Sequence, residues 1–296
     1  MRPFLRVRQV IQLMRFLPLL VLLVGCGSLS ETAVAPTPTL PATFTPLPSA
    51  TPPLQPTTAV SQASTPEASE GEVDELVEEA IFISQPGPGS RIVNSPLQVT
   101  GIADPTFEQN LVIRLLLADG TELIETPTTI QAELGNRGPF TVDVPFTVSG
   151  EQQAFVQVYA TSARDGGITH LASVGLTLAD SGEEQIVTVE PHAERIQISQ
   201  PALRETISGG TVTVAGETLA SFEQTLVVEL LGEAGELLSS QPVIVNAPDL
   251  GQPGPFSIEL SYEVAASMPG RVVVRDPSPA FGGDVHLASV EITLAP

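Results

Sequence analysis

The chain carries the same unit twice in tandem, and this repeat constrains the fold more than any other feature. The tetrapeptide ISQP at 83–86 returns at 198–201, and the pentapeptide HLASV at 170–174 returns at 286–290. The offset is 115 residues at the first motif and 116 at the second, so the copies differ by a single net insertion. A period this long exceeds the roughly 20–50 residues of solenoid repeats and therefore predicts two tandem domains.

Alternating apolar and polar residues predict β-strands in both copies. Apolar residues occupy every second position at 140–146, and 256–262 keeps the same rhythm. This pattern indicates a strand with one face in a core and the other in water. The strands that we predict for the first copy are 81–84, 97–103, 111–118, 122–132, 140–147, 154–160 and 170–178.

Three segments carry more specific expectations. The run 111–117 is apolar throughout except at Arg114, which predicts a central strand of its sheet. Pro145, inside the run 140–147, predicts an edge position or a bulge because proline cannot donate to a neighbouring strand. Residues 186–189 of the connecting segment could pair as a stray strand.

Seven short strands separated by turns predict an all-β fold, with two tandem immunoglobulin-like β-sandwich domains. The cysteine pair and tryptophan of antibody domains are missing, since the chain has one Cys and no Trp. A fibronectin-type sandwich is the nearest alternative. The predicted boundaries are a first domain at 81–179, a linker at 180–195 and a second domain at 196–296.

Residues 1–25 have the composition of a secretory signal peptide. A basic start that contains Arg2, Arg6, Arg8 and Arg15 precedes a short apolar run at 16–24. The leader ends in LVGC at 23–26, which resembles the lipobox of bacterial lipoproteins. The resemblance implies cleavage before Cys26, lipid attachment to its thiol and an anchor on the extracytoplasmic face of the cell membrane. The alternative is an ordinary signal peptide with an unrelated cysteine.

The segment 26–80 is predicted to be a disordered stalk that follows the lipid anchor. Nine Pro and thirteen Ser or Thr occupy the forty positions 31–70, so little apolar surface is available for a core. Proline also favours extended backbone. The formal net charge of the whole chain is −22, and an acidic surface repels phosphate backbones, so nucleic acid is excluded as a partner.

An ordered set of short motifs gives the repeat a family resemblance. ISQP at 83–86 is followed by GPGS at 87–90, SPL at 95–97 and GPF at 138–140. This set resembles the immunoglobulin-like domain of bacterial spore-germination proteins, over both copies. The resemblance implies a sandwich fold, a cell-envelope setting and no enzymatic activity. The second copy departs from the pattern, with ALR at 202–204 in place of the Pro-Gly turn and Phe281 in place of Asp165.

The loops at one end of each sandwich are the candidate binding surface. In an immunoglobulin-like fold the loop between the second and third strands lies beside the loop between the sixth and seventh. The candidates are therefore Asp104, Phe107, Glu108, Asp165, Phe222 and Glu223. The structural alternative is that both phenylalanines fill the ends of their sandwiches while the glutamates accept hydrogen bonds from loop amides. No loop has the acid spacing of an EF-hand, so no metal is expected there.

The histidines are predicted to be structural. His170 and His286 lie on the inward face of the last strand of each copy, and two such residues from separate domains are expected to stay apart. Neither has a nearby cysteine or second histidine in the sequence, so zinc is not expected. His170 and Ser173 are three positions apart and point to opposite faces of a strand, which excludes them as a catalytic dyad. No cofactor fingerprint is present in the sequence.

Together these features predict a non-enzymatic lipoprotein of the cell envelope. Its paired domains would act as a binding or adhesion module for an envelope protein or a glycan. The alternative function is a structural spacer or assembly subunit without a dedicated ligand.

Overall fold

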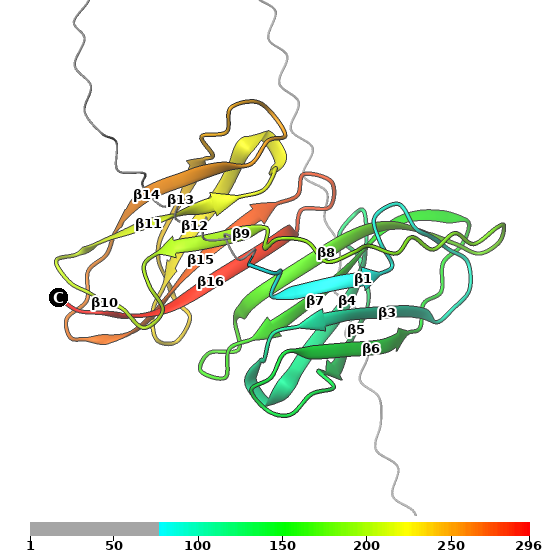
Figure 1. The fold of residues 1–296 in the computed structure, drawn as a ribbon, viewed down its shortest axis with the longest axis horizontal. Coiled ribbons are helices and arrows are strands. Elements are labelled where there is room, and N and C mark those ends of the chain that lie inside the picture. Colours follow the sequence, from blue (N-terminus) through cyan, green and yellow to red (C-terminus); the bar gives the residue numbers. More distant parts are fainter. Residues whose placement is uncertain (1–76) are drawn as a thin grey trace, which may run out of the picture. The chain divides into compact units, whose positions relative to one another are not determined.

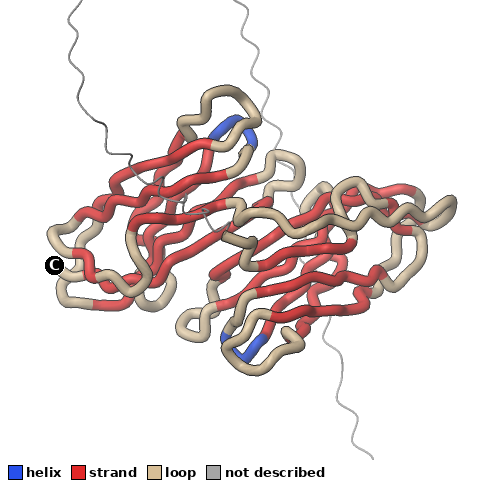
Figure 2. The backbone as a smooth tube through the Cα atoms, viewed as in Figure 1, coloured by secondary structure: helices blue, strands red, loops and turns tan. Residues whose placement is uncertain are grey.

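The computed structural model describes residues 77–296, which contain both repeats (Figures 1 and 2). Both repeats lie within one compact unit, Ser69–Pro296. The predictions for the leader, for Cys26 and for the stalk up to residue 76 lie outside the described residues. Among the helices of the described part, none has the length and apolarity needed to cross a membrane.

The first repeat is a sandwich of two sheets, drawn from cyan to green in Figure 1. One sheet has the strand order β1-β3-β6, and the other contains the run β8-β7-β4-β5, with the short β2 parallel to β8. All seven predicted strands are present, whereas the two-residue β2 is too short to produce a periodic pattern. The bounds are β1 Ile81–Gln85, β2 Arg91–Ile92, β3 Leu97–Ala103, β4 Asn110–Leu117, β5 Glu122–Thr129, β6 Gly138–Val144, β7 Glu151–Thr161 and β8 Ile168–Ala179.

The second repeat, drawn from yellow-green to red, has the same arrangement (Figure 1). One sheet has the order β14-β11-β9, and the other contains the run β13-β12-β15-β16, with β10 parallel to β16. A short 3-10 helix precedes the fourth strand of each repeat: η1 is Phe107–Gln109, before β4, and η2 is Phe222–Gln224, before β12. The strands are β9 Ile196–Gln200, β10 Thr206–Ile207, β11 Thr211–Thr218, β12 Thr225–Leu231, β13 Leu237–Ile244, β14 Gly254–Ser261, β15 Met268–Pro277 and β16 Asp284–Leu294.

The alternating pattern at 140–146 corresponds to a strand with one buried face. In β6, Phe140 and Val144 are buried in the first core, while Thr141 and Asp143 are exposed. The strand lies at the edge of its sheet, as the proline predicted. It ends at Val144, however, so the prediction that Pro145 lies within the strand is wrong. A proline just beyond the last paired residue removes no ladder hydrogen bond.

The prediction of a central strand at 111–117 is confirmed. β4 lies between β5 and β7, and Leu111, Ile113 and Leu115 are fully buried on its inner face. Arg114 points to the other face, where Nε and Nη2 donate to Oε2 of Glu125 at 3.0 and 2.8 Å. The second repeat encloses its own core, in which Val228 and Leu230 of β12 are fully buried.

The connecting segment runs along the first domain. Isolated β-bridges pair Gln185 with Arg91 and Ala193 with Glu78. Two further backbone hydrogen bonds follow: Gly87 N–H donates to Val187 O at 2.7 Å, and Val189 N–H donates to Ser84 O at 2.9 Å. The stray strand expected at 186–189 therefore exists only as these isolated backbone bonds, not as a strand.

Candidate functional site

The last strands of the two repeats pair with each other and join the domains. β16 runs antiparallel to β8, with His286 opposite Ala172 and Leu287 opposite Leu171. Ser289 Oγ strengthens the junction by donating to Thr169 O at 2.7 Å. An apolar cluster fills the space beside the paired strands, and its buried members are Tyr159, Leu171, Val273 and Leu287.

Equivalent residues of the two repeats meet at this junction, as in a dimer with twofold symmetry. Leu171 and Leu287 occupy the same position of the repeat and face each other. The segments that enter the two domains also pair: Glu79 N–H donates to His192 O at 3.3 Å, and Glu194 N–H donates to Val77 O at 2.8 Å. We call this set of contacts between equivalent positions the repeat interface.

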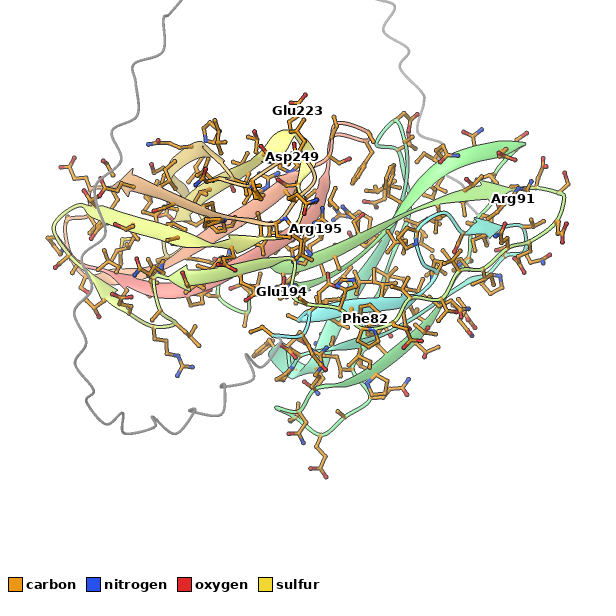
Figure 3. All side chains as sticks on the ribbon, turned by 45° about the horizontal axis from the view of Figure 1, so that its top comes forward. Phe82, Arg91, Glu194, Arg195, Glu223 and Asp249 are labelled. Atoms are coloured by element: carbon orange, nitrogen blue, oxygen red, sulfur yellow. The ribbon has the colours of Figure 1, made fainter. Side chains whose placement is uncertain are left out.

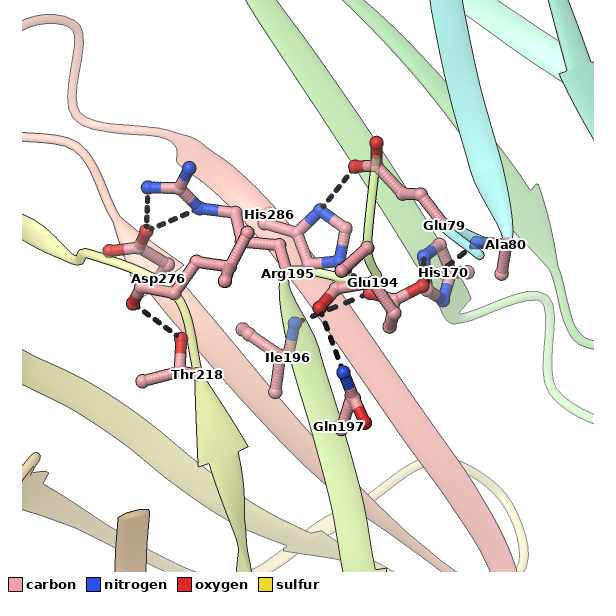
Figure 4. Close-up of polar contacts among 12 residues, drawn as sticks. Glu79, Ala80, His170, Glu194, Arg195, Ile196, Gln197, Thr218, Asp276 and His286 are labelled. Carbon is pink, nitrogen blue, oxygen red and sulfur yellow. Dashed lines mark hydrogen bonds and ion pairs between the residues drawn. The ribbon is translucent and has the colours of Figure 1, made fainter. Parts of the chain in front are cut away.

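Two histidines and two glutamates gather on the axis of the repeat interface (Figure 4). We call Glu79, His170, Glu194 and His286 the histidine–glutamate cluster. His286 Nε2 lies 2.6 Å from Glu194 Oε1, and its Nδ1 lies 3.4 Å from Glu79 Oε1. His170 Nε2 lies 3.5 Å from Glu194 Oε2, and the two imidazole rings meet edge to face with centroids 4.9 Å apart.

Burial and mutual charge set the protonation of this cluster. Burial, reinforced by the carboxylate of Glu194, raises the pKa of Glu79 to about 8. Burial opposes ionisation of Glu194 as well, but the hydrogen bond with His286 and the charges of both histidines lower its pKa to about 2. Burial and the neighbouring His286 lower the pKa of His170 to about 4. The two carboxyl groups therefore differ in protonation at neutral pH: Glu194 is ionised and Glu79 largely is not.

The expectation that the two histidines stay apart is wrong. It treated the domains as independent, whereas the pairing of β8 with β16 brings equivalent positions to one axis. The sequence did contain the signal, because both a histidine and a glutamate recur at equivalent positions of the two copies. Symmetric association places equivalent residues opposite each other at the axis.

On one side of the axis the repeat interface is charged. Arg271 of β15 is fully buried, and its Nη2 donates to Oδ1 of the fully buried Asp165 at 2.9 Å. Arg271 Nη1 lies 3.3 Å from Glu291 Oε1, and Arg164 Nη1 lies 2.5 Å from Glu291 Oε2. Burial opposes ionisation of Asp165, but the Gly167 amide and Arg271 lower its pKa.

On the other side of the axis the equivalent positions are aromatic. Phe281 replaces Asp165 in the second copy, and Phe155 stands in the first copy where the second has Arg271. The two phenylalanine rings stack with centroids 4.0 Å apart and an interplanar angle of 24°. The repeat interface therefore contains one buried ion pair and one aromatic pair at equivalent places.

The structure brings only part of the candidate loop surface together. Asp104 and Phe107 line a groove of about 660 Å³ with the loop residues 161–164, as the sandwich topology predicted. Arg204 and Glu291 of the second repeat complete this loop groove. Asp165 does not belong to it, because its carboxylate is turned into the repeat interface.

The structural alternative, in which the phenylalanines fill the sandwich ends and the glutamates accept hydrogen bonds from loop amides, does not describe the first repeat. Phe107 is 59% exposed, so it does not fill the end of its sandwich. Glu108 is also exposed, and its Oε2 accepts a hydrogen bond of 3.4 Å from the Asn110 side chain rather than from a loop amide. Asp104 pairs with Arg137. Glu223 is exposed near Asp249 at the loop end of the second repeat (Figure 3), and the prediction for the Phe222 side chain lies outside the described part.

The tripeptide FEQ occurs in both copies, at 107–109 and 222–224, and its glutamine has a structural role that no sequence pattern indicated. Gln109 is buried, and its Nε2 donates to the carbonyl oxygens of Glu133 and Asn136 at 3.2 and 3.0 Å. Gln224 Nε2 likewise donates to Asp249 O at 2.7 Å. The glutamine thus anchors the long loop before the β6 or β14 strand, so this motif is explained by loop structure.

The fold defines a protein of two immunoglobulin-like β-sandwiches in tandem. The sequence model of the family described as the immunoglobulin-like domain of bacterial spore germination matches residues 80–167 and 195–283, more than half of the chain. The chain therefore belongs to this family, which confirms the resemblance inferred from the repeated motifs. A search among curated proteins finds no match to the sequence.

Solved structures with similarity to the chain are distant. Red sea bream transglutaminase aligns at 10% identity over 73% of this chain and 31% of its own, with a TM-score of 0.27. Dimeric latent PorU from Porphyromonas gingivalis aligns at 14% identity over 74% of this chain and 20% of its own, with a TM-score of 0.26. The chain thus spans about a third or less of these proteins, and similarity at this level carries no functional argument.

Proposed function

We propose that the chain is a non-enzymatic, lipid-anchored protein of the cell envelope that binds a protein or glycan partner through the loop groove. The leader, Cys26 and the Pro/Thr-rich stalk would hold the domain pair on the extracytoplasmic face of the membrane. Membership of the immunoglobulin-like family supports a non-enzymatic module. The loop groove supports the choice of binding over a purely structural role.

The backbone of Arg204 is the observation that carries the proposal. Arg204 has φ 63°, a left-handed conformation, at the position where the first repeat has Gly89 at φ 81°. A residue with a side chain is disfavoured in this region by about 1 kcal/mol or more, whereas glycine is not. Strained residues of this kind gather at ligand sites. Arg204 adopts this disfavoured backbone conformation, and its side chain lines the loop groove.

The lining of the groove combines an apolar contact with charges of both signs. Phe107 presents more than half of its side chain to solvent, and it lies among Asp104, Arg164, Arg204 and Glu291. An exposed aromatic residue beside arginines is typical of the residues that dominate binding energy at interfaces. Two domains contribute to the groove, so a partner would contact both repeats at once.

Replacing Arg204 with glycine separates binding from folding. Arg204→Gly removes the strain, so we expect the free energy of unfolding to stay equal or rise by about 0.5–1 kcal/mol. We expect capture of the partner to fall at least tenfold, as it should with Phe107→Ala. Leu250→Ala is the matched control, since Leu250 is exposed on the second repeat outside the groove.

Capture is measured separately with solubilised envelope proteins and with purified cell-wall glycan. A component retained by the natural chain and by Leu250→Ala, but lost with both groove variants, supports the proposal. Equal retention by all four proteins, or by none, contradicts it and favours the spacer.

The lipid anchor has its own test. We expect Cys26→Ser to move the protein from the membrane fraction to the soluble fraction, because the thiol that accepts the lipid is gone. Fractionation followed by immunoblotting measures the change. An unchanged membrane fraction would contradict the anchor without affecting the groove.

A further inference from the structure

We propose that His170, Glu194 and His286 form a binding site for a divalent transition-metal ion, best matched by Zn²⁺, on the axis of the repeat interface. The three residues come from the first domain, the connecting segment and the second domain (Figure 4). A bound ion would therefore fasten all three parts of the described chain at one point.

The donor atoms already converge. One ligand atom from each residue lies within 4.8 Å of the other two. Zinc bonds of roughly 2.0–2.1 Å in a tetrahedral site place two ligand atoms about 3.3 Å apart. His170 Nε2 and Glu194 Oε2 are 3.5 Å apart, and His286 Nε2 and Glu194 Oε1 are 2.6 Å apart. Side-chain shifts of about 1 Å or less would complete the coordination.

One nitrogen of the cluster has no hydrogen-bond partner among the described residues. His170 Nε2 is buried and makes no hydrogen bond within the described residues. It lies 3.5 Å from Glu194 Oε2, without the geometry of a hydrogen bond. Buried polar atoms without a partner are rare in proteins. A cation between His170 and Glu194 would satisfy both groups.

The donor set selects the kind of ion. Two imidazole nitrogens with one carboxylate are typical ligands of zinc and of neighbouring transition metals. Calcium and magnesium prefer oxygen ligands, and calcium takes about six to eight of them. Three protein ligands leave a fourth position, which a water molecule or a second oxygen of Glu194 would occupy.

The surroundings hold the proposed ligands in place. Ala80 N–H donates to Glu194 Oε2 at 2.8 Å, which fixes the carboxylate from behind. Glu79 Oε1 lies 3.4 Å from His286 Nδ1, on the side of the ring away from Glu194. In metal sites the second ring nitrogen of a histidine ligand usually meets a carboxylate or a carbonyl in this way.

Charge and access also favour a cation. The nearest guanidinium groups are compensated, because Arg195 pairs with Asp276 and Arg137 pairs with Asp104. A groove of about 330 Å³ reaches His170 and Glu194 from the surface and passes Val77 and Ser289. The formal net charge of −22 raises the local concentration of cations around the chain.

The test uses the full-length chain, purified in detergent and freed of metal with a chelator. Zn²⁺ binding is titrated by calorimetry, and Co²⁺ binding is followed by visible absorption. We expect one equivalent of each ion, and a tetrahedral Co²⁺ spectrum. His170→Ala should weaken binding at least about 100-fold, because even residues behind the ligands contribute about 10–100-fold. Leu250→Ala, at an exposed position of the second repeat, and Cys26→Ser are controls and should bind as the natural chain does.

His170→Ala is the decisive variant because it breaks no hydrogen bond of the described residues. Circular dichroism should match that of the natural chain, and the metal-free melting temperature should fall modestly because the buried imidazole and its contact with His286 are lost. Added Zn²⁺ should raise the melting temperature of the natural chain alone. Glu194→Gln serves as a second ligand variant. No stoichiometric binding by the natural chain, or full binding by His170→Ala, would overturn the proposal. Neither result bears on the loop groove.

Discussion

The two sides of the repeat interface are filled by different kinds of contact, one charged and one aromatic. Asp165 and Arg271 form a buried ion pair, while Phe281 and Phe155 form an aromatic stack at the equivalent positions. Asp165 is equivalent to Phe281, and Arg271 is equivalent to Phe155. In both contact pairs, one residue comes from each domain. The two copies therefore differ as matched contact pairs, with the charges on one side of the axis and the aromatic rings on the other.

The two pairs should contribute to stability in different ways. A buried ion pair gains little net free energy, because its attraction is offset by the loss of hydration of both charges. Removal of one partner is costly, since the other charge stays buried alone. A stacked pair of phenylalanines gains from burial and adds about 0.5–1.5 kcal/mol from its geometry. The ion pair should therefore be the more sensitive side of the interface.

Arg271→Ala should have the largest effect. It removes the fully buried partner of Asp165 and leaves that carboxylate only the partly exposed Arg164, whose Nη2 lies 3.3 Å from Oδ2, so we expect the free energy of unfolding to fall by about 3–5 kcal/mol. Chemical denaturation followed by circular dichroism measures the loss. Arg164→Ala is the control: its guanidinium is partly exposed, and it should cost about 1 kcal/mol or less. Equal losses in the two variants would show that the buried pair has no special role.

Phe281→Ala should cost less. The variant loses the stack on Phe155 and exposes apolar surface, so we expect a decrease of about 3 kcal/mol in the free energy of unfolding, the low end of the range for buried phenylalanines. The same denaturation experiment applies. A loss below about 0.5 kcal/mol, the usual range of surface substitutions, would mean that the aromatic side does not hold the domains together.

The double variant Asp165→Phe with Arg271→Phe makes the two sides alike and should have the smallest effect. Replacement of a buried ion pair by apolar residues is often neutral or stabilising, so we expect no loss and a gain of about 1 kcal/mol. The gain is small because Glu291 and Arg164 lose their neighbours. A double variant as unstable as Arg271→Ala would show that the two pairs are not interchangeable.

Sequence patterns predicted the strands of both sandwiches well because apolar and polar residues alternate along a strand with one buried face. The alternation around Phe140 and the continuous apolar run of β4 each identified the correct strand and its place. The two-residue β2 is too short to show this alternation, so it was not predicted. The predicted strand 140–147 included Pro145, whereas β6 ends at Val144, because the alternation of apolar residues continues beyond the last paired residue.

The site was less predictable because it depends on contacts between distant surface positions. Asp104 and Phe107 were placed in a common loop end by topology alone, and the loop groove contains both. Asp165 was assigned to the same surface, although its partner Arg271 lies 106 residues away in the sequence. The matched differences between the copies, Asp165 for Phe281 and Phe155 for Arg271, were the available signal.

The most direct test of the account is whether the two repeats are oriented as one body. Residual dipolar couplings of the backbone amides, measured on the intact chain, give an alignment tensor for each repeat separately. The paired strands, the histidine–glutamate cluster and both contact pairs predict the same tensor for 81–179 and 196–296. Two different tensors would show that the domains move independently and would contradict the repeat interface.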